Sequence, residues 1–304
     1  MRLLLLGSLI VLNLSCRKDT KNKDLALNTD LNTISYDEKT GLSEEFKKYW
    51  YAGDAEITSY QLQQARYGEI REGKAVLIYV TEDFDKQQQV KADYPSKNNS
   101  SVLKLNATKK FTTGVYPYSI MQSTFYPVSN DKHALKVTSS IQEWCGHVYA
   151  QLNNRDTFKV NAFSYFQSEG DEFFELDKTI LENEIWTQLR IDPESLPVGS
   201  IKAIPSLEFT RLKHVPIKAY DAEANFEGDL YSINYPSLNR TLTIQFNTKF
   251  PYDIISWEES FKSGYGPNAK VMFTKATKIK QLKIPYWSKN GLKDDNLRNQ
   301  LGLN

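Results

Sequence analysis

The chain has 304 residues, which is enough for one large domain or two modest ones. Charged residues make up 25% of it and the formal net charge is +1, so it lacks the basic footprint of a nucleic-acid-binding protein and we expect no nucleic-acid partner. Aromatic residues make up 12%, with 18 Tyr and 15 Phe, and this composition favours β-strands.

The first 15 residues have the pattern of a secretory signal peptide. Arg2 precedes an apolar run that begins at Leu3, and this run is too short to span a bilayer as a permanent helix. The polar stretch "RKDTKNKD" follows it directly. The run therefore predicts export rather than a buried N-terminal element.

The end of this segment, "LNLSC", resembles the lipobox of bacterial lipoproteins, with Asn13 in a place where a branched apolar residue is commoner. The resemblance implies cleavage before Cys16 and acylation of that residue's thiol and amine. Several acyl chains on one residue anchor a protein stably in a membrane. We therefore expect a lipid-anchored protein of the cell envelope, on the periplasmic or surface face of an outer membrane.

The mature chain is expected to have three parts. Residues 16–42 form an acylated, flexible tether, because they are polar and show no periodicity. One β-rich domain is expected over 43–290, since no break in composition divides it, and a polar tail over 291–304. The domain is expected to begin with a short helix that Ser43 caps.

From Ala55 onward the chain predicts mainly β-strands. The stretches "AEITSYQLQQARYGEI" and "KAVLIYVTEDF" are expected to meet in a hairpin at Gly73. Near the C-terminal end, Leu242, Ile244 and Phe246 alternate with polar residues, which is typical of a sheet with one wet face.

One amphipathic helix is predicted in "KTILENEIWTQLRID", over residues 178–192. Ile180, Leu181, Ile185 and Leu189 recur on one face, and Pro193 stops the helix.

About a dozen strands with short connections indicate a mainly β fold. We expect a long antiparallel meander that forms a curved half-barrel or a two-layer sheet, with one or two helices packed on it. Such a meander must curl, close or fold into two layers to protect its edges.

The stretch "SSIQEWCGHVYAQL" holds the first candidate catalytic residues, Glu143, Cys145 and His147. On a strand of period two these side chains share one face, where a thiol, an imidazole and a carboxylate could serve nucleophilic chemistry or bind a metal. A bulge at Gly146 would instead turn His147 away from Cys145. A tight hairpin turn at Cys145 and Gly146 is a third interpretation.

Other polar groups give no metal or cofactor motif, so neither is expected. His133 and His214 lack the spacing of a metal triad. "SWEESF" is expected to form a helical turn packed on the sheet, with Glu258 and Glu259 on its solvated side as candidate carboxylates. "GYGPN" lacks the features of a phosphate-binding loop.

Aromatic clusters suggest a concave apolar pocket for an acyl chain or another hydrophobic ligand, although most of these rings are expected in the core. The candidate ligand-binding residues are Tyr116, Tyr118, Phe125, Tyr126 and Trp144.

Four stretches resemble one family of envelope lipoproteins of Bacteroidota-type bacteria: "WYAGDAEITSYQLQQARYGEIREGKAVLIYVTEDF", "LNATKKFTTGVYPYSIMQSTFYPV", "SSIQEWCGHVYAQLNNR" and "SWEESFKSGYGPNAK". Members are commonly named "septum formation inhibitor Maf". True Maf proteins are cytoplasmic nucleotide pyrophosphatases with an N-terminal Ser-x-Ser-Pro-Arg-Arg motif, which this chain lacks. At the level of fold, the expected sheet is similar to the curved half-barrels of periplasmic lipoprotein and lipid carriers.

The sequence favours a membrane-anchored, non-enzymatic envelope lipoprotein that binds a lipid, another apolar ligand or an envelope protein partner on its curved sheet. The alternative is an envelope hydrolase that uses carboxylates or the neighbourhood of Cys145 and His147. A third function, in septum formation or nucleotide pyrophosphate hydrolysis, is implied by the family name alone.

Overall fold

The computed structural model describes residues 42–130 and 133–303. The expected signal peptide, the expected lipid-attachment residue Cys16 and most of the expected tether lie outside these residues.

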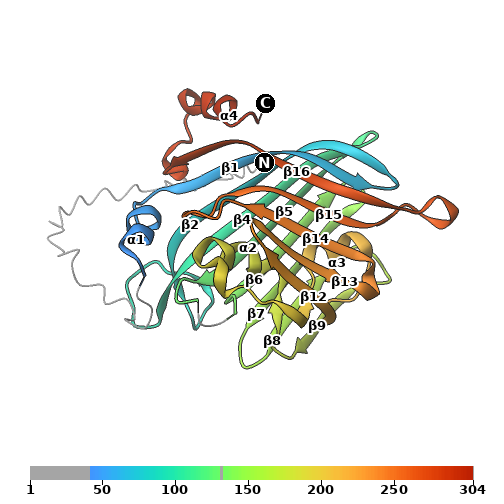
Figure 1. The fold of residues 1–304 in the computed structure, drawn as a ribbon, viewed down its shortest axis with the longest axis horizontal. Coiled ribbons are helices and arrows are strands. Elements are labelled where there is room, and N and C mark those ends of the chain that lie inside the picture. The colour runs from blue at the N-terminus through green and yellow to red at the C-terminus, as the bar shows by residue number, and fades with distance from the viewer. Residues whose placement is uncertain (1–41, 131–132, 304) are drawn as a thin grey trace, which may run out of the picture. The chain divides into compact units, whose positions relative to one another are not determined.

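The described residues form one large β-sheet (Figure 1). Its strands are β1 (Ala55–Arg66), β2 (Glu69–Asp85), β3 (Val90–Lys91), β4 (Asn99–Thr113), β5 (Tyr116–Pro127), β6 (Lys136–Glu143), β7 (Gly146–Asn154), β8 (Phe158–Phe163), β9 (Asp171–Leu176), β10 (Ile180–Leu181), β11 (Gly199–Ile204), β12 (Tyr220–Glu227), β13 (Leu230–Tyr235), β14 (Arg240–Phe246), β15 (Ile254–Ser263) and β16 (Lys270–Ile284).

Most strands that follow one another in the chain are neighbours in the sheet. The order is β10 through β16, then β1, β2 and β4 through β9, with β3 paired only to β2. β16 pairs antiparallel with β1, so the first and last strands lie side by side within the sheet. The sheet stays open, with β9 and β10 as its two edges. The predicted mainly β fold, a long antiparallel meander in a curved sheet, is confirmed.

The exception to the antiparallel pattern is the pairing of β10 with β11, which is parallel. A helix lies between these two strands in the chain and provides the crossover connection that parallel strands need.

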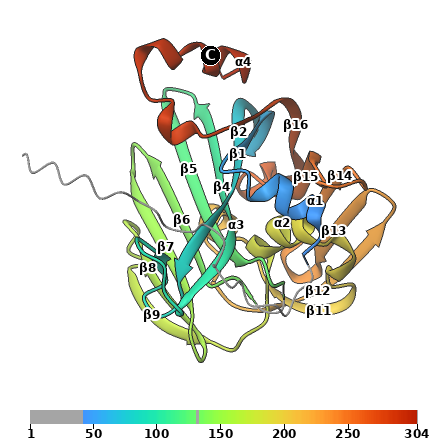
Figure 2. The same cartoon turned by 90° about the vertical axis from the view of Figure 1, so that its left-hand side faces the viewer.

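The helices are α1 (Glu44–Trp50), α2 (Glu182–Ile191), α3 (Leu207–Lys213) and α4 (Asn296–Gln300). Figure 2 shows α2 and α3 between the two arms of the curved sheet. Ile185 and Leu189 of α2 are fully buried in the same apolar cluster as side chains of β1, β2, β4, β5, β14 and β15. The two helices therefore fill the concave side of the sheet.

Helix α2 begins later than the sequence suggests. Ile180 and Leu181, which were expected on its apolar face, form β10 instead. The Glu184 carboxylate accepts a hydrogen bond from the Leu181 N–H at 3.0 Å and so marks the start of the helix. Acidic side chains in a first helical turn also interact favourably with the helix dipole.

The C-terminal residues, expected as a polar tail from 291, form α4 and pack against the sheet through one apolar side chain. Leu301 is buried, and the Ser59 hydroxyl of β1 donates a hydrogen bond to its carbonyl oxygen.

Two buried arginines hold α2 at both ends. At the C-terminal end, Arg190 donates two hydrogen bonds of 2.7 Å to the carboxylate of Glu56 on β1. At the N-terminal end, Arg240 of β14 forms a two-pronged ion pair with Glu182 and donates from Nε to Glu259 of β15 at 2.6 Å. The side chains of both arginines are buried, with only 1% of each exposed.

The Glu56 carboxylate is ionised in this setting. Burial alone would raise its pKa, but the charge and hydrogen bonds of Arg190 outweigh burial and hold the pKa below its usual value. The fold therefore contains a desolvated ion pair whose members depend on each other.

We predict that Arg190→Met lowers the free energy of unfolding by about 3–5 kcal/mol, because it leaves a buried carboxylate without its partner. The measurement is urea denaturation. The double variant Arg190→Met/Glu56→Gln should recover part of the loss, since it removes the uncompensated charge.

The matched control for this prediction is Lys202→Met, which breaks the exposed pair of Lys202 and Asp221 and should change stability much less. Equal losses in the Arg190 and Lys202 variants would contradict the proposed role of the buried pair.

Candidate functional site

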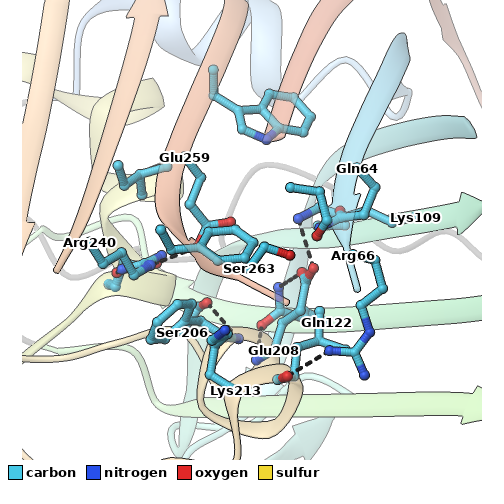
Figure 3. A pocket seen from close by; sticks show the side chains of 18 of the residues that line it. Gln64, Arg66, Lys109, Gln122, Ser206, Glu208, Lys213, Arg240, Glu259 and Ser263 are labelled. Carbon is cyan, nitrogen blue, oxygen red and sulfur yellow. Dashed lines mark hydrogen bonds and ion pairs between the residues drawn. The ribbon is translucent and has the colours of Figure 1, made fainter. Parts of the chain in front are cut away.

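A cavity of about 110 Å³ lies between the concave face of the sheet and helices α2 and α3 (Figure 3). Strands β1, β2, β4, β5, β14 and β15 supply its walls. By the volume that a single buried water needs, about 10–15 Å³, this space holds several waters or a small ligand.

The lining changes from apolar to polar along the strands. From β15 and the hairpin after it, the lining residues are, in order, Trp257, Glu259, Phe261, Ser263, Gly264 and Tyr265. Trp257 is 4% exposed and Tyr265 is 72% exposed, so the apolar end is closed and the mouth lies at the hairpin. Further side chains around the apolar end are Leu77, Leu105, Trp186 and Leu242.

A hydrogen-bonded network crosses the middle of the cavity and ties α3 to the sheet. Lys109 of β4 and Gln122 of β5 donate to the two carboxylate oxygens of Glu208 on α3, at 2.8 and 2.9 Å. Asn183 of α2 donates to the amide oxygen of Gln122 at 2.9 Å. Both helices and two strands are thus joined at one place.

The carboxyl group of Glu208 lies in a desolvated position. Burial raises its pKa, and the neighbouring Lys109 ammonium offsets only part of that effect. The ion pair of Arg240 with Glu182 and Glu259 forms a second wall of this middle region. The charged groups in the middle of the cavity are therefore bound to one another.

Gln64 of β1 presents an unused hydrogen-bond acceptor in the cavity lining. Its side chain is 1% exposed, and its amide nitrogen donates to the Thr274 hydroxyl at 3.1 Å. Its amide oxygen has no hydrogen-bond partner among the described residues. A buried polar atom without a partner is costly, so a ligand or water that donates a hydrogen bond there would be stabilised.

An aromatic rim at the mouth consists of Tyr67 and Tyr265, which line the cavity, and of Tyr116 and Trp144, which continue from Tyr67. The rings of Tyr67 and Tyr265 stack with centroids 6.3 Å apart, and those of Tyr116 and Trp144 lie 6.5 Å apart. The Tyr116 hydroxyl donates to that of Tyr67 at 3.4 Å, which joins the two pairs. The rim brings together the tips of four different hairpins.

The first candidate catalytic residues lie in one of these hairpins, outside the cavity lining. Glu143 pairs with Gly146, so the hairpin has a tight turn. The turn consists of Trp144 and Cys145, one residue earlier than the expected Cys145 and Gly146, because Gly146 already belongs to β7. The Gly146 backbone packs against the ring of Tyr165, where a Cβ atom would come within 2.5 Å. Close approach, rather than a bulge, explains this glycine.

Cys145 and His147 do not form a dyad in the described hairpin. The Cys145 side chain is exposed, and hydrogen bonding to Glu143 raises its thiol pKa, which disfavours the reactive thiolate. The ring of His147 contacts the Ser140 hydroxyl at 3.1 Å instead.

Among the described residues, none of the five aromatic residues that the sequence suggests as ligand-binding residues lines the cavity. Tyr116 and Trp144 belong to the rim. Tyr118 is buried beside it, stacked on Phe111. Phe125 stacks on Phe84, and Tyr126 is buried in a separate apolar cluster.

The prediction of a helical turn in "SWEESF" is wrong, because these residues form part of β15. Strand alternation sends Glu258 and Glu259 to opposite faces. Glu258 pairs with Lys275 at 2.7 Å, whereas Glu259 is buried and lines the cavity.

The two other histidines each contact a carboxylate: His133 contacts Glu184, and His214 contacts Glu169. Within residues 42–130 and 133–303, no three His, Cys, Asp or Glu side chains are grouped in a way that could hold a metal ion. Nor does this part of the chain contain a helix with the length and apolar character needed to cross a bilayer.

Sequence reasoning missed the cavity residues Gln64, Lys109, Gln122 and Glu208. Three of them occupy inward positions of strands whose other residues on that face are mainly apolar, as in Leu103, Leu105, Ala107, Lys109 and Phe111 of β4. A polar residue within such an alternation was the available signal.

Comparisons with known proteins do not show a family for this chain. No family model matches it, and no curated protein matches it. Among solved structures it is similar to a beta-barrel-like protein of the domain of unknown function DUF1849 from Brucella abortus, with a TM-score of 0.37 and 9% sequence identity over 76% of this chain and 98% of that one. A likeness of this degree carries no functional argument, so function is argued from the cavity.

We predict that Glu143→Gln speeds alkylation of Cys145 by iodoacetamide at mildly alkaline pH, because it removes the carboxylate that raises the thiol pKa. Mass spectrometry of the labelled protein gives the rate, and Cys145→Ala supplies the blank.

His147→Gln is the control for the same experiment and should leave the alkylation rate unchanged. A slower rate in this variant would show that His147 activates the thiol, as in a catalytic dyad.

Proposed function

We propose that the protein is a lipid-anchored protein of the cell envelope that binds a small amphipathic ligand in the cavity beneath α2 and α3, without transforming it. The observation that carries the proposal is the buried amide oxygen of Gln64, which has no partner among the described residues, in a cavity with a closed apolar end. Such a combination of apolar walls and a few polar groups is typical of ligand sites.

The size and lining of the cavity define the ligand. About 110 Å³ suits a short apolar group better than a complete long acyl chain. The apolar end offers the edge-to-face pair of Trp186 and Trp257, with ring centroids 5.3 Å apart. The middle offers the Gln64 acceptor, so a ligand with an apolar end and a hydrogen-bond donor fits both regions.

The arrangement of charges supports binding more than catalysis. Glu208, Glu259 and Arg240 in the cavity are each engaged in ion pairs, whereas a general acid or base must be free to exchange a proton with a substrate. Cys145 and His147 lie in the hairpin turn and the strand after it, outside the cavity lining.

The anchor in the proposal rests on the lipobox-like stretch at Cys16. We predict that the protein incorporates labelled palmitate in growing bacterial cells, and that Cys16→Ser abolishes the incorporation. Cys145→Ser is the matched control, since it removes the other cysteine and should leave labelling intact. Labelled lipid on the Cys16→Ser variant would contradict the anchor.

Native mass spectrometry of the full-length protein from membranes tests the binding function. We predict a non-covalent adduct on the wild-type protein that is lost in Ala107→Trp, because this residue lines the cavity and the larger ring fills it. Denaturation releases a non-covalent adduct, whereas the acyl chains of the anchor stay covalently attached.

The control for cavity filling is Thr108→Trp, next along β4 and absent from the cavity lining, which should keep the adduct. An adduct retained by Ala107→Trp, or a protein partner in place of a small ligand, would contradict the proposal. Conversion of the bound molecule into a hydrolysis product would favour the hydrolase alternative.

A further inference from the structure

Two cations lie at the mouth of the cavity. Arg66, at the end of β1, donates to the carbonyl oxygen of Leu212 at 2.7 Å and to the hydroxyl of Tyr118 at 3.2 Å. Lys213, at the end of α3, donates to the carbonyl oxygen of Lys262 at 2.6 Å. Both side chains line the cavity, and Figure 3 shows them with the network around Glu208.

Neither cation forms an ion pair with a carboxylate of the described residues, since their partners are neutral oxygens. The nearby Glu169 does not fill this role, because it contacts Arg211 and His214. The Nε atom of Arg66 is buried and has no hydrogen-bond partner in the described chain. The mouth therefore holds positive charge and an unused donor.

The charge of Arg66 acts on Lys213. Burial lowers the pKa of the Lys213 ammonium, and the positive charge of Arg66 lowers it further. Glu259, deeper in the cavity, opposes this effect only in part. An anion at the mouth would offset the burial and the repulsion that disfavour the charged form of Lys213.

We propose that the ligand carries an anionic group, a carboxylate or a phosphate monoester, which Arg66 and Lys213 bind at the mouth while its apolar part points toward Trp186 and Trp257. This inference rests on the proposed function and names the chemical class of its ligand. A guanidinium presents a fork of donors that suits both anions, and an ammonium adds a mobile donor.

The remaining features of the mouth fit such a ligand. The Arg66 guanidinium stacks on the ring of Tyr67 at 4.3 Å, which fixes its plane. The exposed ring of Tyr265 faces Tyr67 across the rim. A ligand held here would keep its charged group near water and its apolar part in the closed end.

Calorimetric titration of the full-length protein in lipid nanodiscs tests the inference, with empty nanodiscs as the blank. The probes are hexanoate, hexyl phosphate, uncharged hexanol and inorganic phosphate. Hexanoate, hexyl phosphate or both should bind more tightly than hexanol, and inorganic phosphate should bind more weakly than hexyl phosphate because it lacks the apolar part.

Arg66→Gln and Lys213→Gln should each weaken binding of the charged probe about tenfold and leave hexanol binding unchanged, because a charge-assisted hydrogen bond is lost. Arg66→Lys and Lys213→Arg keep the charge and should retain most of the affinity. Arg71→Gln and Lys262→Gln are matched controls, since these side chains do not line the cavity. Thermal unfolding verifies that each variant is folded.

Equal affinities for hexanol and both charged probes, or unchanged binding in the Arg66→Gln and Lys213→Gln variants, would overturn the inference. If hexanol still binds and Ala107→Trp blocks it, the proposed function stands and the anionic class alone fails. If no probe binds and the isolated protein carries no adduct, the proposed function fails as well. Inorganic phosphate that binds as tightly as hexyl phosphate would show a simple anion site and contradict an amphipathic ligand.

Discussion

Burial of two guanidinium groups inside the curved sheet is the constraint on which the rest of the structure depends. Arg190 and Arg240 lie at opposite ends of α2, and each is matched by carboxylates from the helix or from the strands facing it. Removing two charges from water costs several kcal/mol for each ion, and only accurate pairing repays that cost. The pairing therefore fixes the position and the direction of α2 in an open sheet whose edges do not meet.

This fixed helix also determines where positive charge stays available. Glu182 and Glu259 are occupied by Arg240, and Glu208 is occupied by Lys109 and Gln122. The carboxylates in the middle of the cavity are thus satisfied by partners from the protein itself. Arg66 and Lys213, one step nearer to solvent, bind neutral oxygens instead. The buried ion pairs and the two cations without a carboxylate partner are consequences of one arrangement. Because the cavity carboxylates are already paired, Arg66 and Lys213 remain available to bind an anionic ligand.

Alternation along the strands made the fold class predictable, as in Arg240–Phe246, where inward residues are buried and outward residues are not. Local spacing was less reliable. Trp257 and Phe261 lie four residues apart, which suits one face of a helix and one face of a strand equally well. The first hairpin was expected at Gly73, but the chain turns at Tyr67 and Gly68. Gly73 lies within β2, where a Cβ atom would collide with the Lys110 carbonyl of the neighbouring strand. Close packing of the two strands, rather than a turn, therefore requires glycine at this position.

The site was harder to predict because its residues come from segments that are distant in sequence. Glu143, Cys145 and His147 drew attention as chemically rich neighbours, yet in the hairpin tip Cys145 and His147 are exposed, and Glu143 interacts with Cys145 without joining it to His147. Lys109 and Glu259 each lie between apolar residues on the inward face of their strands, and Gln64 lies between Leu62 and Arg66. These residues meet only when β1, β4 and β15 curl around the helices. A single polar residue on the inward face of a strand costs stability unless it finds partners. Several strands with one such residue each therefore indicate a common polar centre, and this pattern is a better guide to a site in a curled sheet than any local motif.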